Sequence, residues 1–128
     1  MRRAIQRFEA YRSEAIRLAE KHNIPVHISI AEPEAWYVIE GFSSVANHYG
    51  VHEDWLMNDR SRKATDIRHS FVFVVVRYFE ITPLRVAQVL NSSHTTISNA
   101  IDKVQDLLDI NDALITEFVE EINDILNA

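Results

Sequence analysis

The sequence contains no cysteine, only two glycines and only three prolines. Without cysteine, neither a disulfide nor a thiolate metal site can hold the fold together, and this absence is typical of a reducing cytosol. The two glycines, Gly41 and Gly50, are too few for a P-loop or a dinucleotide-binding fingerprint, so we expect no bound nucleotide. An apolar core must therefore stabilise this protein by itself.

Long hydrophobic runs are also missing from the sequence. No stretch reaches the roughly 18 consecutive apolar residues that a membrane-spanning helix requires. The basic N-terminus is not followed by the apolar segment of a signal peptide. We therefore expect a cytoplasmic protein that does not bind membranes. Its 128 residues suffice for one core with an extension rather than for two domains.

Residue sets that are typical of enzymes and metal centres do not stand out. His48 and His52 are four residues apart, but Gly50 interrupts the helix between them and no carboxylate completes a zinc site. No set of serine, histidine and acid suggests a nucleophilic triad. We therefore predict a protein that is not an enzyme and that has no catalytic residues, no metal ligands and no cofactor.

Positive charge is concentrated in one part of the chain. The formal net charge is −6, but residues 60–103 carry seven Lys and Arg against three Asp and Glu. Residues 104–128 carry no Lys or Arg and seven acidic residues. Binding of phosphate requires a local positive potential rather than a positive protein. This distribution favours nucleic-acid binding by residues 60–103, with residues 104–128 turned away from DNA.

Hydrophobic periodicity predicts an all-α helical bundle. Helices are expected over residues 2–22, 31–50, 51–57, 82–90, 92–108 and 109–128. Gly41 is a candidate for a kink or break in the second of these helices. The last helix should begin at a cap provided by Asp109 or Asn111, should carry an acidic outer face and should pack on the first helix.

One segment between the first two helices has a different period. Val26, Ile28 and Ile30 alternate with polar residues, which predicts an extended segment. This segment either packs irregularly or pairs with its copy in a homodimer. We divide the chain into an N-terminal helix with this extended segment (1–40), a central domain (41–108) and an acidic helix packed on the same core (109–128).

Residues 71–76, with the sequence Phe-Val-Phe-Val-Val-Val, are ambiguous. Their β propensity alone predicts a buried strand. However, Ile67, Phe71, Val74 and Tyr78 also fit helical spacing. Both hypotheses stay open on the residues alone.

The last part of the basic segment has the pattern of two short helices joined at Asn91-Ser92. Thr82 followed by Pro83 is typical of a helix start, because the threonine caps the helix and the proline needs no N–H in the first turn. A second start follows at Ser92-Ser93, where a hydroxyl can cap the next helix. Together these signals predict a helix-turn-helix.

Several short motifs in and before this pattern carry a family resemblance. They are Val45-Ala46, Tyr49-Gly50-Val51, Arg60-Ser61-Arg62, Arg68, His94-Thr95-Thr96, Ala100 and Lys103-Val104. With them, roughly residues 42–108 resemble domain IV, the C-terminal DNA-binding domain of the bacterial replication initiator DnaA, which contains a Trp-repressor-like helix-turn-helix. The resemblance implies a helix over residues 67–79, double-stranded DNA as partner, and a role in replication or transcription control.

The resemblance also implies candidate DNA contacts. At the first turn of a recognition helix, threonine offers a methyl group to thymine and imidazole can hydrogen-bond to a base edge. The candidate base-contacting residues are Ser93, His94, Thr95, Thr96 and Asn99, and the candidate backbone contacts are Arg60, Arg62, Lys63 and Arg68. The hydroxyls also fit a purely structural capping role, and the basic residues also fit an ordinary solvated loop.

Two sites depart from the DnaA pattern. Ser92-Ser93 replaces an Arg-Asp pair, and Asp66-Ile67 replaces an arginine-proline pair. An arginine bidentate to guanine provides about 1–3 kcal/mol of discrimination, so we do not expect a preference for the DnaA box, the DNA site of that family. These departures, Asp102 and the overall acidity favour an alternative function, a non-enzymatic interaction or oligomerisation module that kept the fold but lost DNA recognition.

Overall fold

The computed structural model describes residue 17 and residues 33–128 of the chain. All regular secondary structure within residues 33–128 is helical, which confirms the all-α prediction for this part. The helices are α2 (Pro33–His48), α3 (Glu53–Asn58), α4 (Arg62–Arg77), α5 (Pro83–Val89), α6 (His94–Asp109) and α7 (Ala113–Asn127). None of these described helices is long and apolar enough to cross a membrane. The helix predicted at 2–22, its packing on the last helix and the extended segment at 26–30 lie outside the described residues.

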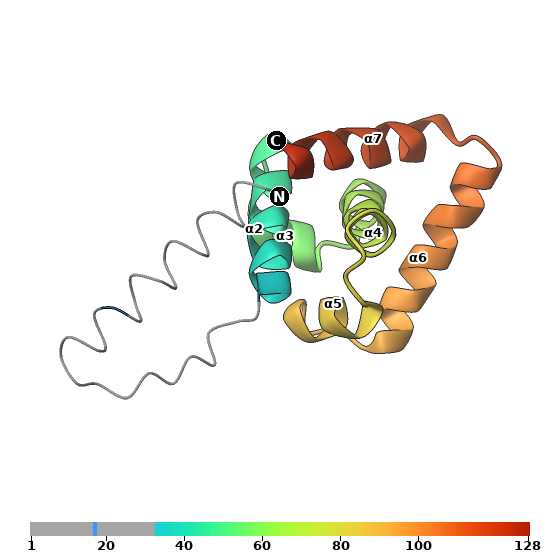
Figure 1. The fold of residues 1–128 in the computed structure, drawn as a ribbon. Helices are drawn as coiled ribbons and strands as arrows, with labels where there is room; N and C mark the ends of the chain where they lie inside the picture. The colour runs from blue at the N-terminus through green and yellow to red at the C-terminus, as the bar shows by residue number, and fades with distance from the viewer. Residues whose placement is uncertain (1–16, 18–32) are drawn as a thin grey trace.

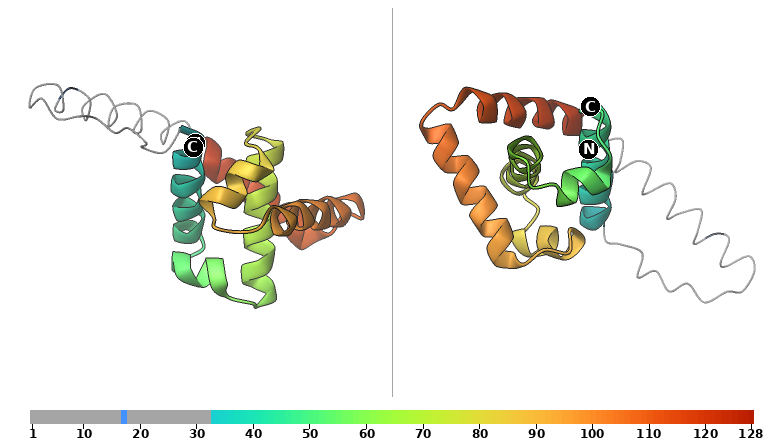
Figure 2. Two further views of the ribbon diagram at one scale, coloured as in Figure 1. Left: turned by 90° about the horizontal axis from the view of Figure 1, so that it is seen from below. Right: turned by 180° about the vertical axis from the view of Figure 1, so that it is seen from behind.

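Helix α4 lies at the centre of this part of the molecule. Figure 1 shows it end-on, with α2, α5, α6 and α7 arranged around it, and it contacts every other helix from α2 to α7. Figure 2 shows it lengthwise, crossed by α6 and joined to α3 at the end where it begins.

This central position explains the conformation of the ambiguous segment. Residues 71–75 are all buried. A helix that is apolar on all sides is stable only when it is enclosed, and the neighbours of α4 provide that enclosure. The helical prediction for residues 67–79 is confirmed, although the helix begins earlier, at Arg62 after the Ser61 cap, and ends at Arg77.

The turn between α5 and α6 is fixed by a Schellman motif. The N–H of Ser92 donates to the carbonyl of Ala87 at 2.9 Å, and the N–H of Asn91 donates to that of Gln88 at 3.4 Å. Asn91 has a φ of 53°, the left-handed conformation that this motif requires. Gly50 (φ 66°) occupies the corresponding position after α2. The backbone therefore determines how α6 leaves α5.

The starts of α5 and α6 follow the sequence signals, with Thr82 and Ser93 as caps, whereas the start of α7 does not. The Thr82 side chain accepts a hydrogen bond from the Arg85 N–H, and Pro83 is the first helical residue, as predicted. For α7, the predicted caps Asp109 and Asn111 are wrong. Helix α6 continues through Asp109, and Asn111 adopts a left-handed φ of 57° that ends it. Asp112 caps α7 instead, by accepting a hydrogen bond from the Ile115 N–H at 3.0 Å.

Helix α7 packs against α2, α4 and α6. Its buried residues are Ile115, Phe118, Val119, Ile122 and Leu126. The Tyr49 hydroxyl, at the end of α2, donates to Glu121 Oε2 at 2.7 Å. Burial, followed by this hydrogen bond, raises the pKa of Tyr49. Because α2 extends through residues 40 and 41, the boundary that we drew there falls inside one helix of the same core.

Helix α2 is continuous through Gly41, where we expected a kink or break. A Cβ atom at this position would lie 2.9 Å from Leu126 Cδ2 and 3.3 Å from Phe71 Cε2. Both neighbours are fully or almost fully buried and cannot move into solvent. Gly41 is therefore required for the close approach of α2 to α4 and α7, and not for a bend.

We predict that Gly41→Ala lowers the free energy of unfolding by about 0.5–2 kcal/mol. Overpacking destabilises a core by about 1–3 kcal/mol. This cost exceeds the roughly 0.5–1 kcal/mol by which alanine is more favourable than glycine inside a helix. Denaturant unfolding measures the change. In a Leu126→Ala background, which removes the nearest atom, the same substitution should stop being destabilising. Equal destabilisation in both backgrounds would contradict the steric explanation.

Candidate nucleic-acid interface

The first turn of α6 projects polar side chains away from the core. Ser93 caps the helix, because its Oγ accepts from the Thr96 N–H at 3.1 Å, and it also lies 2.7 Å from Thr96 Oγ1. These two hydroxyls therefore hydrogen-bond to each other, although both residues are exposed. His94 and Thr95 are exposed and make no hydrogen bond to another described side chain. The structure thus separates four of the five predicted base contacts into a capping pair and an outward pair.

The rest of α6 has one buried and one outward face. The buried residues are Ile97, Ala100, Ile101 and Val104, which pack into the core. On the opposite side, Thr95, Asn99, Asp102 and Asp106 follow one another at helical spacing, and all four are exposed. The outward face of α6 is therefore uncharged in its N-terminal half and acidic beyond it.

Three of the predicted basic residues lie at or before the start of α4. Arg60 precedes the helix, whereas Arg62 and Lys63 form its first turn, and all three are exposed. Arg62 Nε lies 3.6 Å from Asp66 Oδ2, and the Asp66 residue is only 5% exposed. The Asp66 side chain is thus buried beneath a surface arginine.

Arg68 is held by the protein itself. Its Nη1 donates to the carbonyl oxygens of Leu56 at 2.7 Å and Asp59 at 3.3 Å, and its Nη2 lies 3.4 Å from Thr65 Oγ1. Burial lowers the pKa of Arg68, and the nearby Asp59 carboxylate opposes this shift. Arg68 therefore joins the end of α3 to α4, a role that the sequence does not indicate, because the accepting carbonyls are contributed by backbone.

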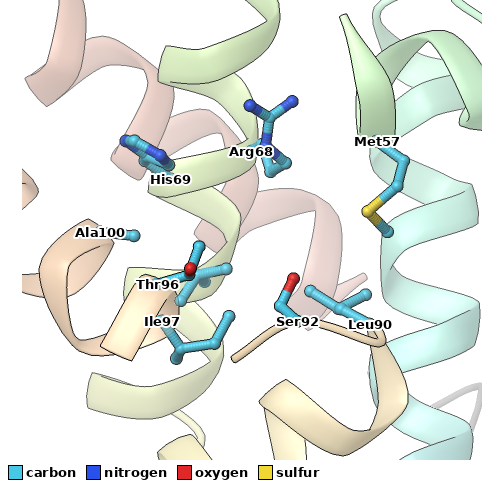
Figure 3. A pocket seen from close by; sticks show the side chains of 9 residues that line it. Met57, Arg68, His69, Leu90, Ser92, Thr96, Ile97 and Ala100 are labelled. Carbon is cyan, nitrogen blue, oxygen red and sulfur yellow. The ribbon is translucent and has the colours of Figure 1, made fainter. Parts of the chain in front are cut away.

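A pocket of about 80 Å³ separates the N-terminal half of α4 from the α5–α6 turn. It is lined by Met57, Arg68, His69, Val72, Leu90, Ser92, Thr96, Ile97 and Ala100. Figure 3 shows Arg68 and His69 on α4, with Thr96, Ile97 and Ala100 of α6 across the pocket. Arg68 and His69 of α4 and the first two turns of α6 therefore border the same depression.

His69 connects α4 electrostatically to α6. Burial lowers its pKa, and the charges of Arg68 and Lys103 lower it further, whereas Asp66 raises it. Its Nδ1 atom is buried without a hydrogen-bond partner among the described residues. Lys103 of α6 therefore acts on the same imidazole as Arg68 of α4.

His69 and Lys103 were not predicted as site residues from the sequence. Lys103 belongs to the Lys103-Val104 motif of the DnaA resemblance. That motif alone could have identified it as a candidate site residue. For His69, the sequence shows the adjacent Arg68 and Asp66 three residues earlier. It does not show that His69 is buried against α6, because this depends on tertiary packing.

We predict that Arg68→Ala lowers the free energy of unfolding by about 1.5–3 kcal/mol, because two partly buried carbonyls lose a charged donor. Arg60→Ala, which removes an exposed arginine nearby, should change it by no more than about 0.5 kcal/mol. Urea titration of both variants measures these changes. If Arg68→Ala were as stable as Arg60→Ala, the hydrogen bonds to α3 would have no structural importance.

We also predict that the pKa of His69 in the folded protein lies below 6.5, its ordinary value. The unfolded chain then binds the proton more tightly, so the stabilising contribution of neutral His69 is present above pH 6.5 and is lost as the pH falls through its folded pKa. The stability advantage of wild type over His69→Gln should shrink between pH 7.5 and 5.5. An NMR titration that gave a His69 pKa at or above 6.5 would refute this prediction.

The candidate site combines the exposed start of α6, a small pocket that it shares with Arg68 and His69, and exposed basic residues at the start of α4. Among residues 33–128, no three His, Cys, Asp or Glu side chains gather in a way that could hold a metal ion. The chain matches no protein-family model, no curated protein and no solved structure.

Proposed function

We propose that this protein is a non-enzymatic, double-stranded DNA-binding protein, in which α5 and α6 form a helix-turn-helix and α6 is the recognition helix. The observation that carries the proposal is the exposed first turn of α6, which borders one pocket with Arg68 and His69 of α4, the helix whose first turn carries the exposed Arg62 and Lys63. The resemblance to DnaA domain IV supports a role in replication or transcription control.

The chemistry of the α6 start suits a DNA groove. The N-terminal end of a helix favours phosphate, and first-turn side chains of a recognition helix approach base edges. Because the hydroxyls of Ser93 and Thr96 bond to each other, we assign base contacts primarily to His94, Thr95 and Asn99. Ser93 and Thr96 then contribute by fixing the turn that aims these side chains.

Backbone phosphates would be bound by exposed basic residues of two helices, α4 and α6. Arg60, Arg62 and Lys63 are exposed beside the start of α4, and Lys103 adds a positive charge from α6. Arg68 contributes mainly by positioning α3 and α4, since its guanidinium is bound to protein carbonyls.

The alternative function, a protein-interaction or oligomerisation module, is favoured by a different region. At the corner between α6 and α7, Ile110 is 73% exposed and Leu114 is 45% exposed. The nearby exposed charges in sequence, such as Asp109 and Glu117, are acidic. Such a corner suits a basic protein partner rather than DNA. An anisotropy titration against mixed duplex DNA at two salt concentrations distinguishes these two functions.

The proposed function predicts a strong salt dependence. The logarithm of the binding constant should fall linearly with the logarithm of salt concentration, and replacing Arg60, Arg62 and Lys63 together by glutamine should reduce that slope by about 2–3. Arg77→Gln, at the far end of α4, serves as the control and should leave the slope nearly unchanged. Circular dichroism confirms folding of each variant. An unchanged slope in the folded triple variant would exclude this surface as the phosphate contact.

A further inference from the structure

The outward face of α6 carries an exposed acidic residue, Asp102, beyond its uncharged N-terminal half. Thr95, Ser98, Asn99 and Asp102 have the spacing i, i+3, i+4 and i+7. In the homeodomain, a helix lying in the major groove contacts bases from residues with this same spacing. Asp102 is exposed and makes no ion pair or hydrogen bond within residues 33–128. Its carboxylate is therefore available to a ligand.

We propose that Asp102 is a specificity-determining residue that accepts a hydrogen bond from the exocyclic amino group of a cytosine in the major groove. This inference depends on the proposed DNA-binding function. Thr95 and Asp102 are seven residues apart, a separation of about 10 Å along the helix. With base pairs stacked about 3.4 Å apart, the outward face spans about three base pairs.

The choice of cytosine follows from the chemistry of the base edges. An ionised carboxylate can only accept hydrogen bonds. Guanine and thymine present acceptors in the major groove, and adenine presents a donor with an acceptor, N7, beside it. Cytosine presents the N4 amino donor alone. Opposite any other base, a carboxylate loses its hydrogen bonds to water without an equally good hydrogen bond to the base. It therefore selects cytosine by disfavouring the other bases as well as by binding cytosine.

In the sequence analysis, the charge of Asp102 favours the loss of DNA recognition, whereas in this proposal Asp102 takes part in DNA recognition. A negative charge near phosphates weakens binding to DNA of every sequence, whereas a cytosine at one position recovers part of that loss. The residue therefore trades general affinity for selectivity. Asp106, one turn further along the same face, carries the same charge and provides a matched control.

The experiment is a selection of duplexes with a randomised core, performed with the full chain. Wild type should enrich cytosine at one position, and replacing this cytosine by thymine should weaken binding by about 5-fold or more in an anisotropy titration. Asp102→Asn should enrich adenine at that position, because an amide pairs with adenine N6 and N7. Asp106→Asn should retain cytosine. The unfolding midpoints of both variants should match that of wild type.

Three results would overturn the inference. If Asp102→Asn bound every sequence more tightly and kept the preferences of wild type, Asp102 would act only by repulsion, and the proposed function would stand. If wild type bound duplexes without enriching any base, base recognition by α6 would be refuted, but general DNA binding would stand. If wild type bound no duplex even at low salt, the proposed function and this inference would fail together.

Discussion

The enclosure of α4 on every side is the constraint on which the rest of the structure depends. An uninterrupted apolar run, residues 71–76, lies within the core, and α4 contacts all five of the other helices within residues 33–128. Helix α6 packs on α4 with its own apolar face, which leaves its polar face outward. The orientation of the proposed recognition helix is therefore a consequence of the way in which the core closes.

Local signals in the sequence predicted the parts of the fold that depend on a few neighbouring residues. The Thr82-Pro83 start and the Ser93 cap are such parts, because hydroxyl caps and first-turn proline act within one turn. The start of α7 was not predictable in the same way, because Asp109, Asn111 and Asp112 all have capping side chains. The choice among them depends on where α6 ends. The role of Gly41 depends on Leu126, which is distant in sequence.

The candidate site shows the same division between local and tertiary information. The exposure of His94, Thr95 and Asn99 follows from helical periodicity once α6 is recognised. The internal hydrogen bonds of Arg68 do not, because a charged residue in a basic cluster gives no sign that main-chain carbonyls 9 and 12 residues away will bind it. The sequence thus shows which polar residues lie close together along the chain. The structure shows which of them have hydrogen-bonding groups that are not already bound within the protein.

The composition of α4 has a consequence for the protein before it is folded. Residues 71–76 are uncharged, rich in β-branched and aromatic side chains, and free of proline and glycine, which is the composition of segments that form steric zippers between chains. In the native structure this segment is helical, with residues 71–75 buried and Val76 partly buried, so this tendency is hidden. When the surrounding helices detach, however, the same residues can pair as strands with other copies. Loss of stability in this protein is therefore expected to lead to aggregation rather than to a soluble unfolded chain.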